Sequence, residues 1–113
     1  MVKDEVTFPD FQKLDLRIGK IVKAESVEGS ANLIRMQVDL GQEYGKKKII
    51  GGLAKWYSPT DLKGKRFIIV ANLAPKQMMK EQSYGMILCA DLDGKAPYLI
   101  QVDKKIPVGT VVR

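Results

Sequence analysis

The stretch Val70-Ala-Asn-Leu-Ala-Pro-Lys-Gln-Met-Met-Lys-Glu-Gln-Ser-Tyr-Gly-Met86 decides the fold that this chain is expected to adopt. It joins two apolar runs, Phe67-Ile-Ile-Val70 and Met86-Ile-Leu-Cys-Ala90, whose composition is typical of strands buried on both faces. The segment between them is too long for a simple hairpin turn and carries two lysines and two methionines. Rigid strands that present such a loop can place a binding surface on a scaffold. The alternative is a plain surface loop with solvated lysines.

The size and composition of the chain exclude several classes of protein. We expect its 113 residues to form one domain with a single modest core. No apolar run is long enough to predict a membrane span, and the charged start, Met1-Val-Lys-Asp-Glu5, is unlike a secretory signal. The single cysteine, Cys89, lies in an apolar run, so we expect a buried small hydrophobe in a reducing cytoplasm.

The sequence contains no histidine. This excludes Ser-His and Cys-His nucleophile pairs and removes the usual ligand of a zinc site. No phosphate-binding lysine loop, dinucleotide fingerprint or calcium loop is present. We therefore expect no catalytic centre, no metal and no cofactor on this chain.

Positive charge is concentrated in the middle of the chain, whose net charge is +6. Residues 1–45 carry six basic and eight acidic side chains, residues 46–80 carry nine basic and one acidic, and residues 81–113 carry four of each. Because the whole excess comes from the central block, we expect a polyanionic partner, with nucleic acid as the first candidate. The alternative is that these lysines only keep a small protein in solution.

Hydrophobic periodicity predicts five strands. The first has a change of phase at Gly19, which indicates a bulged and bent strand. The only predicted helix lies within residues 54–64, with Ser58 as its cap and Pro59 at its first position. Phe8 and Phe11 are expected to pack under the first strand. The five strands are residues 14–24, 34–40, 46–50, 67–70 and 86–90.

This order of elements is that of an all-β, five-stranded OB-fold barrel with one short helix between strands 3 and 4. We expect the barrel core at about residues 13–93 and a C-terminal β extension at about residues 95–112. Exposed strand edges need to be paired or covered, so the extension either caps the barrel or forms a subunit interface. In this fold the loops between strands 1 and 2 and between strands 4 and 5 flank the binding face. Here those loops are residues 25–32 and 73–84.

Basic side chains are expected around a shallow groove on this face, with Met78 as an apolar surface for stacking. Such a groove suits backbone and base contacts with RNA or single strands. Arg35 is predicted either to line the groove or to pair with Asp39. The predicted basic rim consists of Arg17, Lys20, Arg35, Lys46, Lys47 and Lys48.

Five motifs resemble those of the tRNA-binding domain family, and the resemblance covers nearly the whole chain, from Phe8 to Val112. They are Phe11-Gln-Lys-Leu-Asp-Leu-Arg-Ile-Gly-Lys-Ile, Val27-Glu-Gly-Ser-Ala-Asn-Leu, Gly51-Gly-Leu, Val70-Ala-Asn-Leu-Ala-Pro-Lys and Ser83-Tyr-Gly-Met86. This family includes the C-terminal domain or small beta subunit of methionyl-tRNA synthetase, stand-alone structure-specific tRNA-binding proteins and the endothelial-monocyte-activating polypeptide domain. The first and fourth motifs are most similar to the methionyl-tRNA synthetase branch.

The resemblance implies a cytoplasmic homodimer that binds the outer corner of tRNA with little sequence preference. It also implies a role as an accessory part of methionyl-tRNA synthetase, raising the tRNA affinity of a catalytic part or subunit elsewhere. Combined with the charge pattern, it predicts tRNA contacts at Asn72, Lys76, Lys80, Ser83, Met86, Arg35, Lys46, Lys47 and Lys48. The implied dimer contacts, in the C-terminal extension, are Tyr98, Ile100, Val102, Ile106 and Val108.

Several alternatives stay open at this point. Asn72 and Ser83 are equally suited to fixing the ends of the loop to the backbone, and Met86 to a place in the core. Many relatives carry a glycine just after the loop methionines, where this chain has Lys80-Glu81, and the Glu81 carboxylate fits poorly beside phosphate. At the level of function, the alternatives are a general single-stranded nucleic-acid binder and a dimeric peptide-binding or chaperone-like protein.

Overall fold

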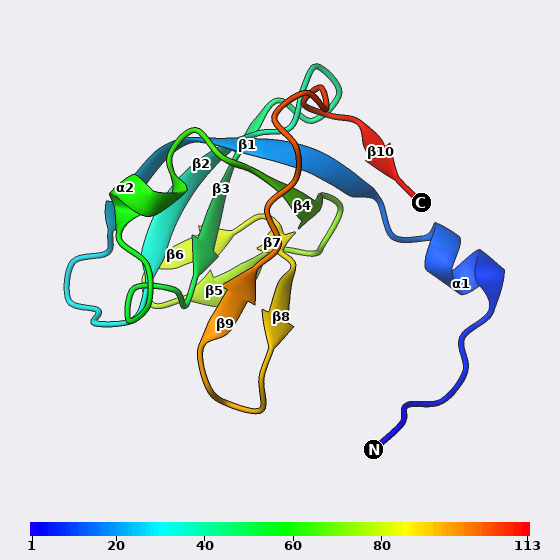
Figure 1. The fold of residues 1–113 in the computed structure, drawn as a ribbon, viewed down its shortest axis with the longest axis horizontal. Coiled ribbons are helices and arrows are strands. Elements are labelled where there is room, and N and C mark those ends of the chain that lie inside the picture. Colours follow the sequence, from blue (N-terminus) through cyan, green and yellow to red (C-terminus); the bar gives the residue numbers. More distant parts are fainter.

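The computed structural model describes residues 1–113 and is organised by one long strand, β1 (Leu16–Ser26). The first half of β1 pairs with β4 (Arg66–Val70) and its second half with β2 (Ile34–Asp39), both antiparallel. The sheet continues to β3 (Lys46–Gly51) on one side and to β7 (Met86–Ile87) on the other (Figure 1). Its two ends meet where the amide of Tyr84 donates to the carbonyl of Lys48 at 2.9 Å. The predicted OB-type barrel is confirmed.

β1 is bent as predicted, but its irregularity lies a few residues further along the strand than expected. The pairing register with β2 shifts between Ile21 and Lys23, not at Gly19. Gly19 has a different role, because a Cβ there would lie 2.7 Å from Val38 Cγ1 and 2.8 Å from Ile69 Cγ1. The glycine therefore lets β1 cross close to the side chains that fill the barrel.

The core lies inside the curled sheet. β2 shows the expected period of two, since Ile34, Met36 and Val38 are buried while the residues between them face outward. This alternation turns the polar side chains of β2 toward the outer surface of the barrel. The core cluster is Ile21, Ile34, Met36, Val38, Leu40, Ile49, Leu53, Leu62, Phe67, Ile69, Ala71 and Ile87.

The expected helix is α2 (Pro59–Leu62), which is shorter than the predicted span of 54–64. Ser58 precedes it with an extended backbone, and the Ser58 amide donates to Asp61 Oδ2 at 2.9 Å. This hydrogen bond holds the pKa of Asp61 below its ordinary value. Leu62 is fully buried, so α2 packs against the core where the sequence predicted a helix between the third and fourth strands.

A second helix, α1 (Phe8–Gln12), was not predicted. It begins after Thr7, whose Oγ1 accepts from the Asp10 amide at 3.2 Å. The expectation that Phe8 and Phe11 pack under β1 is wrong, because α1 projects away from the barrel and these side chains are 68% and 38% exposed (Figure 1). Neither helix has the length and apolar character needed to cross a bilayer.

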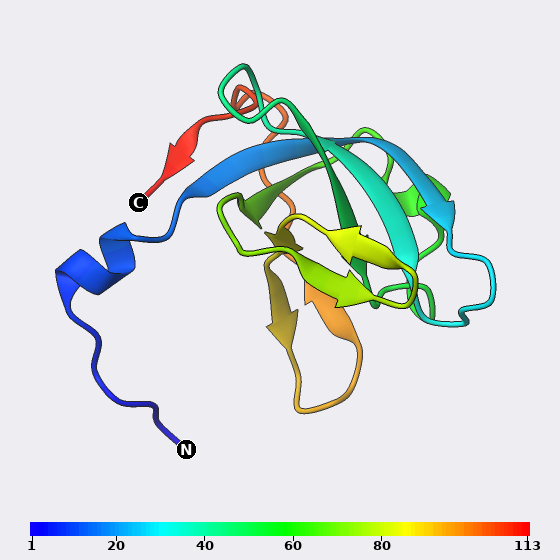
Figure 2. The same ribbon diagram turned by 180° about the vertical axis from the view of Figure 1, so that it is seen from behind.

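The segment expected to be a long loop is a β-hairpin, formed by β5 (Lys76–Met78) and β6 (Glu81–Ser83). A tight turn at Met79 and Lys80 joins the two strands, with Met79 at a φ of +56°. This hairpin, which we call the arm, lies beside β3 across the open face of the barrel (Figure 2). The prediction failed because each arm strand has only three paired residues, with no alternation of apolar side chains to reveal it.

The predicted fifth strand is interrupted at Leu88. β7 stays in the barrel, whereas β8 (Cys89–Asp91) leaves it and pairs with β9 (Pro97–Leu99) in a separate hairpin. Cys89 is half-buried rather than buried, and its partial burial raises the pKa of its thiol. A turn joins β8 to β9, with Asp93 and Gly94 at positive φ.

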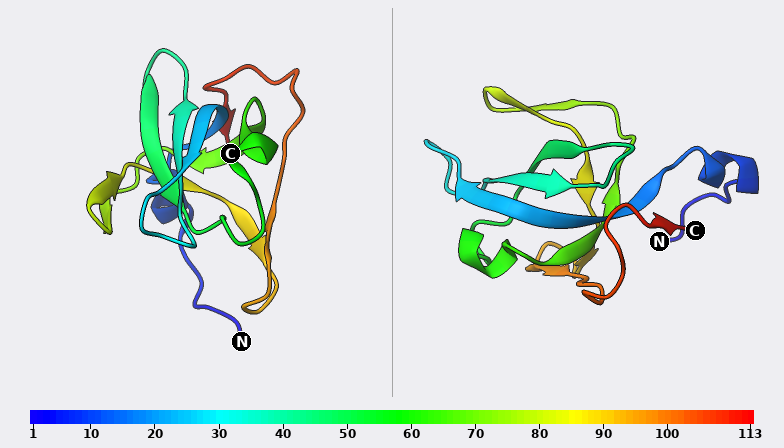
Figure 3. Two further views of the ribbon diagram at one scale, coloured as in Figure 1. Left: turned by 90° about the vertical axis from the view of Figure 1, so that its left-hand side faces the viewer. Right: turned by 90° about the horizontal axis from the view of Figure 1, so that it is seen from above.

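The remaining C-terminal segment runs back over the barrel. The Val102 amide donates to the carbonyl of Arg66 at 3.0 Å, and β10 (Val111–Val112) pairs with the start of β1. β10 and the start of β1 therefore lie side by side close to α1, at one end of the molecule (Figure 3). Tyr98 in β9 and Ile100 just after it remain 55% and 46% exposed.

The packing at Gly19 generates a prediction about stability. Gly19→Ala should lower the free energy of unfolding by about 1–3 kcal/mol, because the added methyl group overpacks the core between β2 and β4. Gly52→Ala is the control, since a Cβ there would meet no atom within 4 Å. Urea unfolding of the two variants measures the difference. Equal stabilities would contradict the close approach of β1.

Candidate nucleic-acid interface

The outer face of β2 and β3 carries a shallow polar groove. Arg35 and Gln37 point outward from β2, and Lys48 and Lys46 lie opposite Gln37 and Asp39 on β3. The groove has a volume of about 380 Å³. It is lined by Lys23, Glu25, Arg35, Met36, Gln37, Lys46, Lys47 and Lys48.

The arm is attached to this face by an ion-pair cluster. Glu81 accepts from Arg35 Nε at 2.6 Å through Oε1 and from Nη2 at 2.7 Å through Oε2. Lys48 Nζ lies 3.4 Å from Oε1 of Glu81, and Arg35 Nη1 donates to Glu25 at 2.9 Å. Arg35 thus lines the groove as predicted, but it pairs with Glu81 and Glu25, whereas Asp39 accepts from the Gly41 amide. The Arg35 guanidinium holds the pKa of Glu81 below its ordinary value.

Ser83 fixes the root of the arm. Its Oγ accepts from the Ile50 amide at 2.9 Å and donates to the carbonyl of Gly85 at 3.2 Å, and the residue is only 3% exposed. The hydrogen bond to Ile50 links the root of the arm to β3, with which β6 has no strand pairing. The hydroxyl is occupied by the backbone, as the loop-fixing alternative expected.

The central lysines differ in what their ammonium groups contact. Lys46, Lys76 and Lys80 are exposed, and Lys80 is at the tip of the arm. Lys47 instead donates from Nζ to the carbonyl of Ala71 at 2.9 Å and lies 4.8 Å from the centre of the Tyr44 ring. Lys76 and Lys80 are part of the arm, Lys48 contacts it through Glu81, and Lys46 lies opposite Asp39 at the start of β3, while Lys47 helps to close the end of the barrel.

An apolar pocket of about 300 Å³ lies beside the arm, at the end of β3. Lys76 and Met78 line it from β5, and Ser83 lines it from β6. Met86 is 47% exposed and forms part of the wall, so its expected place in the core is wrong. The other apolar lining residues are Met36, Ile49, Ile50, Leu53, Leu73, Ile87, Cys89 and Pro97.

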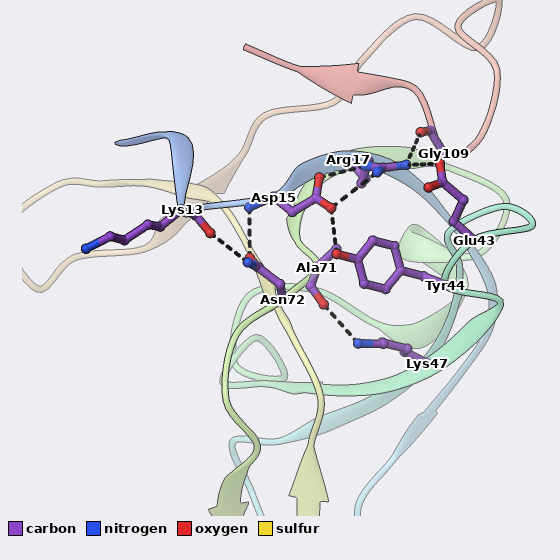
Figure 4. A network of polar contacts seen from close by, with 9 residues as sticks. All are labelled: Lys13, Asp15, Arg17, Glu43, Tyr44, Lys47, Ala71, Asn72 and Gly109. Carbon is purple, nitrogen blue, oxygen red and sulfur yellow. Dashed lines mark hydrogen bonds and ion pairs between the residues drawn. The ribbon is translucent and has the colours of Figure 1, made fainter. Parts of the chain in front are cut away.

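A polar network, shown in Figure 4, ties together the end of the barrel near α1. Asn72 Oδ1 accepts from the Asp15 amide at 2.8 Å, and Asn72 Nδ2 donates to the carbonyl of Lys13 at 2.7 Å. The Asp15 carboxylate accepts from Arg17 Nε at 2.7 Å and from the Tyr44 hydroxyl at 2.6 Å. Asn72 therefore joins the end of β4 to the start of β1, the loop-fixing alternative considered for it.

Arg17 lies at the centre of this network. Its side chain is 11% exposed and pairs with Asp15 and with Glu43, the latter at 2.9 Å. Arg17 Nη1 also donates to the carbonyl of Gly109 at 3.1 Å. The expectation that Arg17 belongs to the basic rim is wrong, because its charge is compensated inside the fold.

Sequence reasoning missed Asp15 and Tyr44 as partners. The signal available was the pair of opposite charges at Asp15 and Arg17, two residues apart on one face of a strand. The Arg17 guanidinium, helped by the Tyr44 hydroxyl, holds the pKa of Asp15 below its ordinary value. The Asp15 carboxylate in turn raises the pKa of Tyr44.

A protein-family model described as "Putative tRNA binding domain" matches residues 16–111. Among curated proteins, methionine–tRNA ligase from Archaeoglobus fulgidus is 44% identical over 110 residues, which cover 97% of this chain and 16% of that protein. Methionine–tRNA ligase from Caldanaerobacter subterraneus is 45% identical over 109 residues, covering 96% of this chain and 17% of that protein. The chain thus spans about a sixth of the length of these relatives.

Two solved structures share the fold along their entire length. The methionyl-tRNA-synthetase-related (MetRS-related) protein from Pyrococcus horikoshii superposes with a TM-score of 0.91 at 34% identity, covering 98% of this chain and 100% of that chain. The chaperone CsaA from Bacillus anthracis superposes with a TM-score of 0.88 at 32% identity, covering 97% of this chain and 100% of that chain.

The Asp15 contacts generate a prediction about pH. Because the folded-state pKa of Asp15 is lowered, its ion pair stabilises the fold above the ordinary value of 3.8, and this contribution is lost as the pH falls through the folded-state pKa. Asp15→Asn should cost about 1–3 kcal/mol at neutral pH. The deficit relative to the unmodified protein should shrink as the pH is lowered from about 5 to about 2.

Urea unfolding across this pH range measures the effect. Asp4→Asn, in the exposed N-terminal segment, is the control and should leave the stability curve unchanged. A deficit for Asp15→Asn that stays constant with pH would show that the charge of Asp15 is not what stabilises the network.

Proposed function

The chain belongs to the tRNA-binding domain family, and from this premise we propose that it binds folded tRNA by shape and phosphate contacts with little sequence preference. The observation that carries the proposal is the cluster of cationic side chains around the arm and the outer groove. Lys46 and Lys48 line the outer groove, Lys80 lines the neighbouring hollow at the tip of the arm, and Lys76 lines the apolar pocket near the root of the arm. Double-stranded RNA is recognised mainly by shape and by phosphate and 2′-hydroxyl contacts, which suits such a surface.

The remaining predicted contacts have supporting roles in this proposal. Lys76 and Met78 would meet an RNA strand that passes over the apolar pocket, and Met86 would offer it an apolar wall. Asn72 and Ser83 would act indirectly, by holding the two ends of the segment that carries the arm. Lys47 would position the edge of β3 through Ala71.

We further propose an accessory role in methionyl-tRNA synthesis. The segment similar to this chain makes up about a sixth of the length of the relatives named methionine–tRNA ligase. The catalytic part would therefore lie outside this segment. A tRNA-binding module attached to or associated with such a catalytic part would raise its local concentration of tRNA. The chain would then work in the cytoplasm, where a synthetase and its tRNA meet.

We also propose that the chain is a homodimer. α1 has only five residues and none is buried, and a helix of that length is not stable by itself in water. Phe8, Leu14 and Val111 leave apolar surface exposed where α1, β1 and β10 come together. A second copy that covers this surface would also bury part of the extension at about residues 95–112. The extension residues proposed for the interface are Tyr98, Ile100, Val102, Ile106 and Val108.

The apolar pocket supports a second candidate function, the binding of unfolded peptides. Its methionine-rich wall could adapt to different apolar side chains. The similarity to a protein named chaperone CsaA favours the same candidate. Suppression of aggregation without measurable tRNA binding would support it over the first proposal. Displacement of tRNA by poly-U at equal nucleotide concentration would instead indicate a general single-strand binder.

The affinity for tRNA should fall with salt, with a log–log slope of about −2 to −5, because a few phosphates are neutralised in each complex. Lys76→Ala should weaken the binding of all tRNAs to a similar degree. Lys63→Ala, which follows α2 and lines neither the groove nor the apolar pocket, is the charge-matched control. A flat salt response, or loss of one tRNA alone, would contradict the proposal.

Light scattering should give twice the mass of the 113-residue chain, and Phe11→Asp should reduce it to the mass of one chain, because it places a charge in the proposed interface. Trp56→Asp is the matched control, since Trp56 is 46% exposed and lies outside α1 and β10. Equal masses for the two variants would count against this interface.

A further inference from the structure

We propose that Arg35 and Lys48 form a phosphate subsite, and that the chain's own Glu81 carboxylate occupies it until an RNA phosphodiester takes its place. The inference rests on the proposed function and deepens it. It assigns to Glu81, the residue that fits poorly in a phosphate-binding arm, the role of an internal competitor for the nucleic acid.

The contact between Arg35 and Glu81 has the geometry that an arginine uses for phosphate. Two guanidinium nitrogens donate in parallel to the two carboxylate oxygens, at 2.6 and 2.7 Å. The same planar fork binds two oxygens of a phosphate group. Lys48 approaches one of these oxygens at 3.4 Å, and Glu25 holds the third guanidinium nitrogen at 2.9 Å. Glu25 therefore keeps the fork oriented toward the position that Glu81 fills.

The cluster is open enough for exchange. The Arg35, Lys48 and Glu81 side chains are 30%, 39% and 19% exposed, so solvent reaches all three. Arg35 and Glu25 line the outer groove on one side and, with Glu81 and Lys80, a second hollow of about 590 Å³ on the other. The ion pair between Arg35 and Glu81 therefore separates the two hollows. An RNA strand laid along the outer groove would pass next to it.

Charge favours the replacement of Glu81 by a polyanion. With Glu81 in place, the two cations of the subsite face two carboxylates, so the subsite attracts a single small anion weakly. An RNA strand brings several phosphates, and Lys23, Lys46 and Lys80 lie around the two hollows to meet them. Solvent reaches the three side chains and screens their attraction, so the several contacts of one strand can displace the single Glu81 carboxylate. Glu81 would therefore suppress the binding of small anions more than that of RNA.

The arm is built so that Glu81 can leave. Ser83 anchors its root through two hydrogen bonds in a buried site, whereas nearer the tip the polar contacts to the barrel are those of Glu81. The two arm strands share only three residue pairs. Loss of the Arg35 contact would release the tip while the root stays attached to β3.

The experiment compares two variants that change the net charge equally. Glu81→Gln removes the internal competitor, and Glu43→Gln removes a carboxylate that is paired with Arg17 outside the groove. Glu81→Gln should bind tRNA about two- to fivefold more tightly than Glu43→Gln, the range expected from an ion pair of this kind. Its log–log salt slope should match that of Glu43→Gln, since the same number of phosphates is neutralised in both complexes and only the competition by Glu81 is removed. Equal or weaker binding by a folded Glu81→Gln would overturn the proposal.

A second measurement does not depend on tRNA. The NMR signal of the Arg35 Nε–H group is followed while inorganic pyrophosphate is added, with Arg35→Met used to assign the signal. In Glu81→Gln the signal should shift at a lower pyrophosphate concentration than in the unmodified protein. No response in either protein would overturn the subsite. A response to pyrophosphate without tighter tRNA binding by Glu81→Gln would show a site for free phosphate and overturn the RNA part.

These two measurements also separate the inference from the proposed function. If the unmodified protein shows no salt-dependent tRNA binding, the proposed function fails, while the pyrophosphate titration still decides whether Arg35 and Lys48 bind phosphate. If tRNA binding is present and Glu81→Gln does not strengthen it relative to Glu43→Gln, the inference fails alone.

Discussion

The pairing of β1 with two different partners is the constraint on which the rest of the structure depends. One strand has to hydrogen-bond to β4 along its first half and to β2 along its second half, so it must bend and cross the core at close range. Gly19 permits the crossing because no Cβ stands between β1 and the side chains of Val38 and Ile69. The barrel that results turns the polar face of β2 outward and brings β3 beside the arm.

Two arginines show how the same chemistry serves two purposes in this barrel. Arg17 and Arg35 each pair with two carboxylates, but the Arg17 side chain is 11% exposed and the Arg35 side chain 30%. Around Arg17 the partners come from the segment just before β1, the turn after β2 and the backbone at Gly109, which makes the cluster part of the framework. Around Arg35 one partner comes from the arm, so that cluster can open without disturbing the core. Burial and the source of the partners separate a structural ion pair from one that can exchange.

The arm connects the family assignment to the surface that would carry its function. The arm begins at Lys76, the last residue of the motif that contains Asn72, and Ser83 holds its root. The motif residues Asn72 and Ser83 therefore mainly fix the position of the arm. The groups free to meet a ligand are the lysines around it and the apolar pocket beside it. Such a division places a small movable element on a rigid barrel, in agreement with the general preference for binding segments on stable scaffolds.

The sequence by itself determined the elements whose signal is local. Alternation in β2, the apolar runs of β1 and β4, the proline and cap of α2 and the lysine-rich centre all predicted what the structure contains. The order of these elements along the chain predicted the barrel. These features are legible because strand periodicity and helix capping involve neighbours a few residues apart.

Only the tertiary structure decided which charged and polar groups are free. Asn72 contacts Asp15 across 57 positions of sequence, and Arg35 contacts Glu81 across 46. No local pattern encodes such pairs, so Arg17 was expected at the rim and the arm was expected to be a loop. The sequence also did not reveal that α1 is exposed. Two phenylalanines in a short segment predict burial, but they do not show whether the surface that covers them belongs to the same chain or to another. Contacts of this kind depend on how the barrel closes, and closure is a property of the whole chain.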